Sequence, residues 1–428
     1  MKSIDWGVFC ESHENKYGGE CTCDSIRRIE VRDIATWFNS NRFTERNHHV
    51  AAPYADLYVS GDLLTDIVLP DTMTRIRPAL FYGCKKLHSV VFPKNLKVID
   101  DYAFSGCDKL DSLSFPASMK TINWAAFCTY RGYGDSCSCE HIRYVDVKDL
   151  HTWINSVRYI GREHDPGFHL YFPKAHLYMG GKLLTHVVIP GDVTEVKPYT
   201  FSGMDSIRTV SMQKGVENVG KLAFSGCRNL SSLSFFEGLK EISSYAFENC
   251  ASLSSVSFSE GLEKIGSYAF ENCGSLTSVA FPEGLTEIEE RAFYGCDKLD
   301  SLSFPASMKA INWTAFCTYR GNFDDSCSCE HIRYVDVKDL HTWINSVRYI
   351  GREHDPGFHL YFPKAHLYMG GKLLTHVVIP GDVTEVKPYT FSGMDSIRTV
   401  SMQKGVENVG KLALVVVLIC HPYPFPRA

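Results

Sequence analysis

The chain has 428 residues, and its hydrophobic content of 44%, with 13% aromatic residues, is ample for a continuous core. Its 44 Lys and Arg against 49 Asp and Glu give a formal net charge of −5, so we expect no nucleic-acid partner and no basic surface for anionic lipid. The longest apolar stretch, at 412–420, is too short to span a bilayer as a helix, and the first residues do not form a secretory signal.

A repeated unit organises the chain. Written approximately as A-F-x-x-C-x-x-L-x-S-L-x-F-P-x-x-L-x-x-I, it recurs with a step of 23 residues within each uninterrupted run. A fixed period of this length is typical of a solenoid or a repeat array. The Phe of the unit falls at Phe81, Phe104, Phe127, Phe201, Phe224, Phe247, Phe270, Phe293, Phe316 and Phe391.

Three longer intervals interrupt the repeats and divide the chain into segments. In chain order we predict an elaborated cassette at 1–80, 23-residue repeats at 81–127, a second cassette at 128–200 and further repeats at 201–316. A third cassette follows at 317–390, then a last repeat at 391–413 and an atypical tail at 414–428. The stretches 107–223 and 296–413 are almost identical, which indicates an internal duplication.

Each cassette is predicted to hold two solenoid strands with a helix, a loop and a hairpin between them. In the second copy, residues 142–147 and 186–189 have strand patterns, and 149–156 is a short helix with Trp153 on its apolar face beside Leu150 and Ile154. The pair Gly180-Gly181 is typical of a tight hairpin turn.

The cassettes are the candidates for partner recognition. Insertions on a solenoid map to one face, which is often the binding face. Tyr159, Tyr171 and Tyr178 are the proposed contact residues, because tyrosine combines a rigid apolar area with a hydroxyl group. The alternative is that the cassettes are spacers that only cover the core.

Each 23-residue unit is predicted to form one coil of a solenoid. In 253–258, Val256 and Phe258 alternate with serines, the period-2 pattern of a short strand, and Gly261 then turns the chain. One coil cannot bury its own apolar residues, but parallel neighbours about 4.8 Å apart can. The sequence therefore predicts a leucine-rich-repeat-like solenoid with a parallel β-sheet, mainly β with short helices and irregular loops.

The sequence of the repeated unit resembles that of a known family. The segment AFENCASLSSVSFSEGLEKIGSYAFENC, at 246–273, is similar to the BspA-like leucine-rich repeats of bacterial and protist surface proteins. The resemblance covers residues 80–130 and 200–316 directly. It implies a parallel-sheet solenoid that is secreted or displayed on the cell surface and used for adhesion and protein recognition.

The tail departs from the repeat. Where another FSGC would follow residue 413, the sequence continues as LVVVLICHPYPFPRA, an uncharged and β-prone run. We expect a truncated or misread gene end, and the alternative is a strand that mediates dimerisation.

A cysteine recurs at one turn position in nine of the coils. A small, apolar residue with a weak S–H donor suits a buried structural position, and Met204 and Met394 occupy the same place, which a metal site or a required disulfide would not tolerate. We therefore expect a structural ladder of thiols. Besides Cys10, its members are Cys84, Cys107, Cys128, Cys227, Cys250, Cys273, Cys296 and Cys317.

Six further cysteines form C-x-C pairs: Cys21/Cys23, Cys137/Cys139 and Cys327/Cys329. Two pairs are followed by Glu-His, which leaves three alternatives open: free thiols, a disulfide to a nearby cassette cysteine, or zinc. The spacing is shorter than zinc sites prefer, so we expect neither metal nor another cofactor.

The sequence contains none of four common catalytic or cofactor-binding motifs: the G-x-S-x-G nucleophile elbow, the H-E-x-x-H metalloprotease helix, the phosphate-binding P-loop and the dinucleotide-binding fingerprint. The sequence therefore predicts a non-catalytic scaffold for protein–protein or cell-surface recognition and adhesion. Two alternatives remain: a structural spacer in a surface array, and a zinc-binding repeat module.

Overall fold

The structure is a computed structural model that describes residues 11–13, 20–22, 26–39, 50–51, 55–130, 136–159, 169–171, 173–319, 327–349, 360–361 and 363–414. The chain divides into two compact units. Unit 1 comprises residues 1–184 with 202–206, and unit 2 comprises 185–201 with 207–428. Each unit is a stack of coils.

A plain coil contains one strand of three or four residues and a second strand of only two. In the strand β26 (Ser255–Ser257), Val256 is buried and both flanking serines are exposed. Gly261 then turns the chain with a φ of +102°, which a residue with a Cβ rarely adopts. The short strand β27 (Lys264–Ile265) follows, and Leu262 and Ile265 are completely buried.

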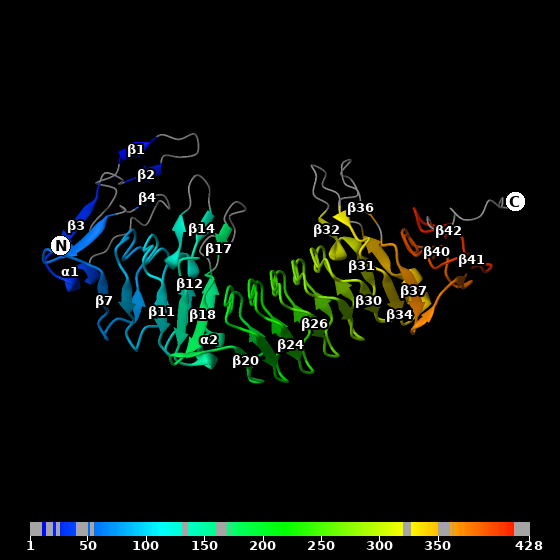
Figure 1. Cartoon of the computed structure of the whole chain (residues 1–428), viewed down its shortest axis with the longest axis horizontal. Coiled ribbons are helices and arrows are strands. Elements are labelled where there is room, and N and C mark those ends of the chain that lie inside the picture. The colour runs from blue at the N-terminus through cyan, green and yellow to red at the C-terminus, as the bar shows by residue number, and fades with distance from the viewer. Residues whose placement is uncertain are drawn as a thin grey trace. The chain divides into compact units, whose positions relative to one another are not determined.

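The longer strands of unit 2 lie side by side in parallel sheets (Figure 1). One sheet consists of β20 (His186–Ile189), β22 (Thr209–Met212), β24 (Ser232–Phe235) and β26. A second sheet consists of β28 (Ser278–Ala280), β30 (Ser301–Phe304), β34 (Tyr334–Val337), β37 (His366–Met369) and the antiparallel β38 (Lys372–Leu373). A parallel pair is formed by β39 (His376–Ile379) and β41 (Thr399–Met402).

The shorter strands form their own parallel ladder, which the sequence analysis did not predict. In unit 2 it runs through β21 (Glu195–Val196), β23 (Asn218–Val219), β25 (Glu241–Ile242), β27, β29 (Glu287–Ile288), β31 (Ala310–Asn312) and β35 (Val347–Tyr349). Two further short strands, β40 (Glu385–Val386) and β42 (Asn408–Val409), form a pair. The third cassette adds a small sheet of β32 (Thr318–Tyr319), β33 (Cys327–Ser328) and β36 (Leu360–Tyr361).

Unit 1 follows the same plan. Its longer strands form three sheets: β3 (Arg28–Val31) with β5 (Asp56–Val59), β7 (Asp66–Val68) with β9 (Ser89–Val91), and β11 (Ser112–Phe115) with β15 (Tyr144–Val147) and β18 (His176–Met179). The two-residue strands β6 (Asp62–Leu63) and β19 (Lys182–Leu183) pair antiparallel with β5 and β18. Its short ladder is β8 (Arg75–Ile76), β10 (Val98–Ile99), β12 (Thr121–Asn123) and β16 (Val157–Tyr159). Two small sheets are formed by β13 (Thr129–Tyr130), β14 (Ser136–Ser138) and β17 (His169–Tyr171), and by β1 (Glu11–His13), β2 (Glu20–Thr22) and β4 (Val50–Ala51).

Helices are short and lie in or beside the cassettes. The α-helices are α1 (Ile34–Asn39), α2 (Leu150–Asn155) and α3 (Leu340–Asn345), and the 3-10 helices are η2 (Trp124–Phe127) and η3 (Trp313–Phe316). The Asp149 carboxylate caps α2 by accepting a hydrogen bond from the backbone N–H of Thr152. Trp153 and Ile154 are buried as predicted, whereas Leu150 is only half-buried.

The core is a column of phenylalanine rings. From Phe201 to Phe316 in unit 2, rings of consecutive coils are stacked with centroids 5.0–5.7 Å apart. The N–H of each Phe from Phe201 to Phe293 donates to the carbonyl of an Ala in the next coil, as Phe224 does to Ala246 at 2.8 Å. Each coil therefore buries its neighbour, and the predicted parallel-sheet solenoid is confirmed. Across the described ranges, no helix is long and apolar enough to cross a membrane.

Candidate recognition surface

The outward side of the longer strands carries mostly small polar residues in the plain repeats. Because successive side chains of a strand point to opposite faces, the residues flanking each buried position face outward. In unit 2 these residues are exposed or half-buried, and we call them the serine lane. Its members are Thr209, Ser211, Ser232, Ser234, Ser255, Ser257, Ser278, Ala280, Ser301 and Ser303.

Larger side chains follow the serine lane where the third cassette begins. Register partners across β34, β37 and β38 place Asp336, Tyr368 and Leu373 in one row and Tyr334 and His366 in a second. The rings of Tyr334 and Tyr368 are 6.2 Å apart and tilted by 41°. Tyr334 is 46% exposed and Leu373 is 47% exposed. We call these five residues the hairpin patch of unit 2.

The second cassette builds an equivalent hairpin patch in unit 1. It consists of Tyr144, Asp146, His176, Tyr178 and Leu183, in the same register on β15, β18 and β19. The two tyrosine rings are 6.1 Å apart, Tyr144 is 44% exposed, and Leu183 is 50% exposed. Both units therefore present an aromatic pair next to an exposed leucine.

The aspartate of each patch holds the hairpin against the sheet. Asp146 accepts hydrogen bonds from the backbone N–H of Gly181 at 2.8 Å, from the Ser114 hydroxyl at 3.0 Å and from the Lys148 ammonium at 2.7 Å. Burial alone would raise the pKa of Asp146, but these hydrogen bonds outweigh it and the pKa is lowered. Asp336 accepts the equivalent bond from Gly371 N–H at 3.0 Å, so this carboxylate positions the exposed leucine in both units.

The first cassette uses the same positions differently. Arg28 replaces the first tyrosine, and its guanidinium lies 3.7 Å from the ring centroid of Tyr58. Arg28 also forms an ion pair with Glu30 at 3.0 Å. The ring of Tyr58 is therefore engaged within the chain, and the first cassette presents a charged counterpart rather than an exposed aromatic pair.

Of the three proposed contact tyrosines, Tyr178 lies in a hairpin patch. The backbones of Tyr159 and Tyr171 belong to β16 and β17, but their side chains lie outside the described residues. The sequence analysis did not select Tyr144 or Leu183. The signal was present, because Tyr144 alternates with the buried Val145 and Val147, which places the tyrosine on the outward face.

Six members of the predicted thiol ladder are buried free cysteines: Cys84, Cys107, Cys227, Cys250, Cys273 and Cys296. Five thiols of this ladder donate to the carbonyl of a Phe in the preceding coil, as Cys250 does to Phe224 at 3.4 Å. Burial raises the pKa of Cys250, so its thiol stays protonated and unreactive. Cys10 lies outside the described residues.

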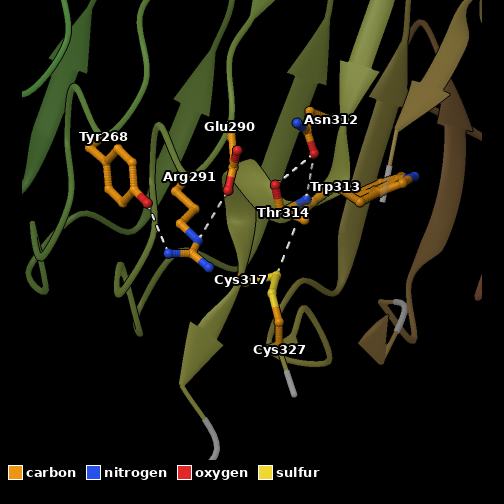
Figure 2. A network of polar contacts seen from close by, with 8 residues as sticks. All are labelled: Tyr268, Glu290, Arg291, Asn312, Trp313, Thr314, Cys317 and Cys327. Atoms are coloured by element: carbon orange, nitrogen blue, oxygen red, sulfur yellow. Dashed lines mark hydrogen bonds and ion pairs between the residues drawn. A yellow bond between two sulfur atoms is a disulfide. The ribbon is translucent and has the colours of Figure 1, made fainter. Parts of the chain in front are cut away.

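The two ladder positions at the cassettes differ from this expectation. Cys317 is bonded to Cys327 with Cα atoms 5.5 Å apart, directly after η3 (Figure 2). Cys128, the equivalent residue of the second cassette, is also disulfide-bonded. The reason is the antiparallel pairing of β32 with β33, which brings the C-x-C pair beside the turn that holds Cys317. The pair Cys21/Cys23 lies outside the residues whose side chains are described.

In the third cassette, the Glu of the Glu-His that follows the C-x-C pair is engaged in an ion pair, and the ring nitrogens of the His are buried without a hydrogen-bond partner. Glu330 forms an ion pair with Lys364 at 2.7 Å, and burial lowers the pKa of His331. Sulfurs joined in a disulfide are not thiolate ligands. Among the described side chains, no group of three or more His, Cys, Asp or Glu residues could hold a metal ion.

Comparison with protein families matches three segments, residues 56–147, 174–299 and 364–416, which together make up more than half of the chain. The matching family is described as the BspA type leucine rich repeat region, with 6 copies. No curated protein matches the chain significantly.

Several solved structures are similar to the chain. A leucine-rich repeat protein from Bacteroides ovatus is 19% identical, with 81% of this chain and 82% of that chain covered and a TM-score of 0.48. A leucine rich cell surface protein from Faecalibacterium prausnitzii is 19% identical, with 78% of this chain and 87% of that chain covered and a TM-score of 0.39. A leucine rich repeat protein from T. pallidum is 31% identical over 36% of this chain and 72% of that chain, with a TM-score of 0.31.

Proposed function

The chain belongs to the BspA-type leucine-rich repeat family, and from this premise we propose that it is a non-catalytic scaffold that recognises protein partners outside the cell. The binding elements in this proposal are the two hairpin patches. The solenoid holds them in place and presents them at the sheet surface.

The hairpin patches carry the proposal because their composition is that of an interface. Protein interfaces are enriched in tyrosine, and a few aromatic and apolar residues supply most of the binding energy. Tyr334 and Leu373 leave about half of their surface in water although neighbouring outward positions are serines. Exposed apolar patches of this kind mark sites of protein interaction.

Location outside the cell is supported by the cassette disulfides. The Cys317–Cys327 bond and the disulfide at Cys128 would persist in an oxidising environment and would be reduced in most cytosols. Secretion or surface display is also what the family resemblance implies. Adhesion is the corresponding expectation for the whole molecule.

Binding of the purified full chain to immobilised extracellular-matrix proteins and to washed animal cells tests the proposal. The variant Tyr178→Ser/Tyr368→Ser removes one ring from each patch. We expect it to weaken binding at least about tenfold, because a well-packed interface tyrosine contributes about 2 kcal/mol. Each single variant is expected to lose less, since the remaining patch can still bind.

Phe236→Ser is the matched control. Phe236 is 56% exposed and follows β24, which belongs to a different sheet from the strands of either hairpin patch, so its removal also reduces exposed apolar area without changing a patch residue. Binding by this variant should equal that of the wild type. A wild-type chain that binds none of the surfaces contradicts the proposal and favours a structural spacer, and equal losses in all variants refute the role of the patches.

A further inference from the structure

Cys317 lies next to two cysteines at once. It is bonded to Cys327, and the Sγ atom of Cys329 is 3.8 Å from the Sγ atom of Cys317. Cys327 begins β33 and Cys329 directly follows this strand, so Cys317 has both cysteines of the C-x-C pair beside it. Cys317 and Cys329 are completely buried, and Cys327 is 6% exposed.

The Cys329 thiol is oriented by its surroundings. Its S–H group donates to the backbone carbonyl of Trp313, with Sγ and O 3.2 Å apart, which leaves the sulfur lone pairs free to face other atoms. A disulfide bond is about 2.05 Å long, so the sulfur of Cys329 has to move by less than about 2 Å to reach bonding distance from Cys317. A change of side-chain rotamer covers that distance.

We propose that Cys317 exchanges its disulfide partner between Cys327 and Cys329. The Cys329 thiolate attacks the Sγ atom of Cys317, the Cys317–Cys329 bond forms, and the Cys317–Cys327 bond breaks. Cys327 leaves as a thiolate and takes up a proton in place of the one that Cys329 released. The number of disulfides and of free thiols is unchanged, so the step requires neither an oxidant nor a reductant.

The exchange changes which cysteine is free. Before it, the free thiol is Cys329, which is buried near η3; after it, the free thiol is Cys327, in the strand β33 that pairs with both β32 and β36. Burial raises the pKa of Cys329, so little thiolate is present at neutral pH. The exchange is therefore slow at neutral pH and accelerates with rising pH.

The second cassette carries the equivalent cysteines in a near-identical sequence. Cys128 is disulfide-bonded, and Cys139 is a completely buried free thiol whose Sγ atom is 3.3 Å from the carbonyl oxygen of Trp124. These positions correspond to Cys317 and Cys329. Each unit therefore holds a buried free cysteine in the same cassette as a disulfide-bonded ladder cysteine.

Differential labelling of the oxidised full chain tests the proposal. Samples incubated at pH 7 and pH 9 are acidified to stop exchange, unfolded, and labelled at free thiols with N-ethylmaleimide at low pH. They are then reduced and labelled with iodoacetamide. Trypsin releases GNFDDSCSCEHIR (321–333) from the third cassette and GYGDSCSCEHIR (132–143) from the second, so fragment spectra assign each label to one cysteine of one cassette.

We expect maleimide on Cys329 in part of the molecules and on Cys327 in the rest, with the mixture approached about tenfold faster for each unit of pH. Cys329→Ser should give no maleimide on Cys327. Cys327→Ser should form the Cys317–Cys329 bond in a folded chain. Cys296, a free ladder thiol, should carry maleimide at every time point. Wild-type protein that stays labelled only at Cys329 after long incubation at pH 9 overturns the proposal, whatever the variants show.

Discussion

At the scale of the residue, stability comes from side chains that fill one layer and contact the next. Phe247 is completely buried between Phe224 and Phe270, with both ring centroids 5.2 Å away. Its N–H also bonds to the carbonyl of Ala269 at 2.7 Å. A single phenylalanine therefore links three coils.

Phe247→Ala should lower the free energy of unfolding by about 3–5 kcal/mol, because it removes a buried ring and leaves a cavity. Urea unfolding followed by circular dichroism measures the loss. Phe236→Ala removes the same side chain from an exposed site and should change stability by less than about 0.5 kcal/mol. Equal effects of the two substitutions would show that the rings do not form a buried column.

A second residue-scale prediction concerns Glu271. Burial, and then the charge of Glu248, raise the pKa of Glu271 to about 7. The folded state therefore binds this proton more tightly than the unfolded state, and the wild type gains stability as pH falls from about 7 towards 4.5. Glu271→Gln removes the dependence, so it should be more stable than the wild type at pH 8 by on the order of 1 kcal/mol, after allowance for partial exposure.

Thermal unfolding at pH 8 and pH 5 measures this difference, which should shrink towards zero at the lower pH. The exposed Glu260→Gln provides the control for loss of one negative charge. An advantage of Glu271→Gln that grows on acidification would mean that the sign of the coupling is wrong.

At the scale of the element, the turns decide how closely coils approach. Gly215 has a φ of +114°, and a Cβ added there would lie 2.0 Å from the carbonyl oxygen of Gly191 in the preceding coil. A Cβ added at Gly274 would meet only open space. The two glycines therefore differ in what a methyl group would cost.

Gly215→Ala should destabilise the chain by more than about 1 kcal/mol, because both its backbone conformation and the contact with Gly191 exclude a Cβ. Gly274→Ala should change the unfolding free energy by no more than about 1 kcal/mol, in the stabilising direction. Chemical denaturation of both variants measures the contrast. Indistinguishable midpoints would contradict the close approach of the two coils.

The sequence predicted the longer strands and the glycine hairpin because their signals are local. Val256 alternates with serines, and Gly180-Gly181 sits between two short strands. The second ladder was missed because a strand such as β27 has only two residues, too few to show a period. Its existence depends on the neighbouring coils, each of which supplies the same two residues.

The site was only partly predictable for a similar reason. Tyr178 was selected as an exposed cassette residue. Its contact with Tyr144 depends on the register of β15 and β18, in which Tyr144 pairs with His176, 32 residues later in the chain. The disulfide partner of Cys317 was undetermined, because spacing does not reveal which cysteine an antiparallel hairpin brings near. Long-range pairing, which the structure supplies, decides both.

At the scale of the whole molecule, the buried phenylalanine rings and the exposed hairpin patches both result from the stacking of coils. Coils that bury each other's phenylalanines must turn their other strand face outward, and the cassettes place tyrosine and leucine on that face. Units 1 and 2 each carry one such patch.

Hydroxyl-radical footprinting of the chain, free and bound to a matrix surface that retains it, tests this account most directly. In the free chain, Tyr334, Leu373 and Phe236 should be oxidised readily and Phe247 should be protected. Binding should protect Tyr334 and Leu373 and leave Phe236 unchanged. Two results would contradict the account. One is oxidation of Phe247 as fast as that of Phe236, and the other is oxidation of Tyr334 to the same extent in the free and the bound chain.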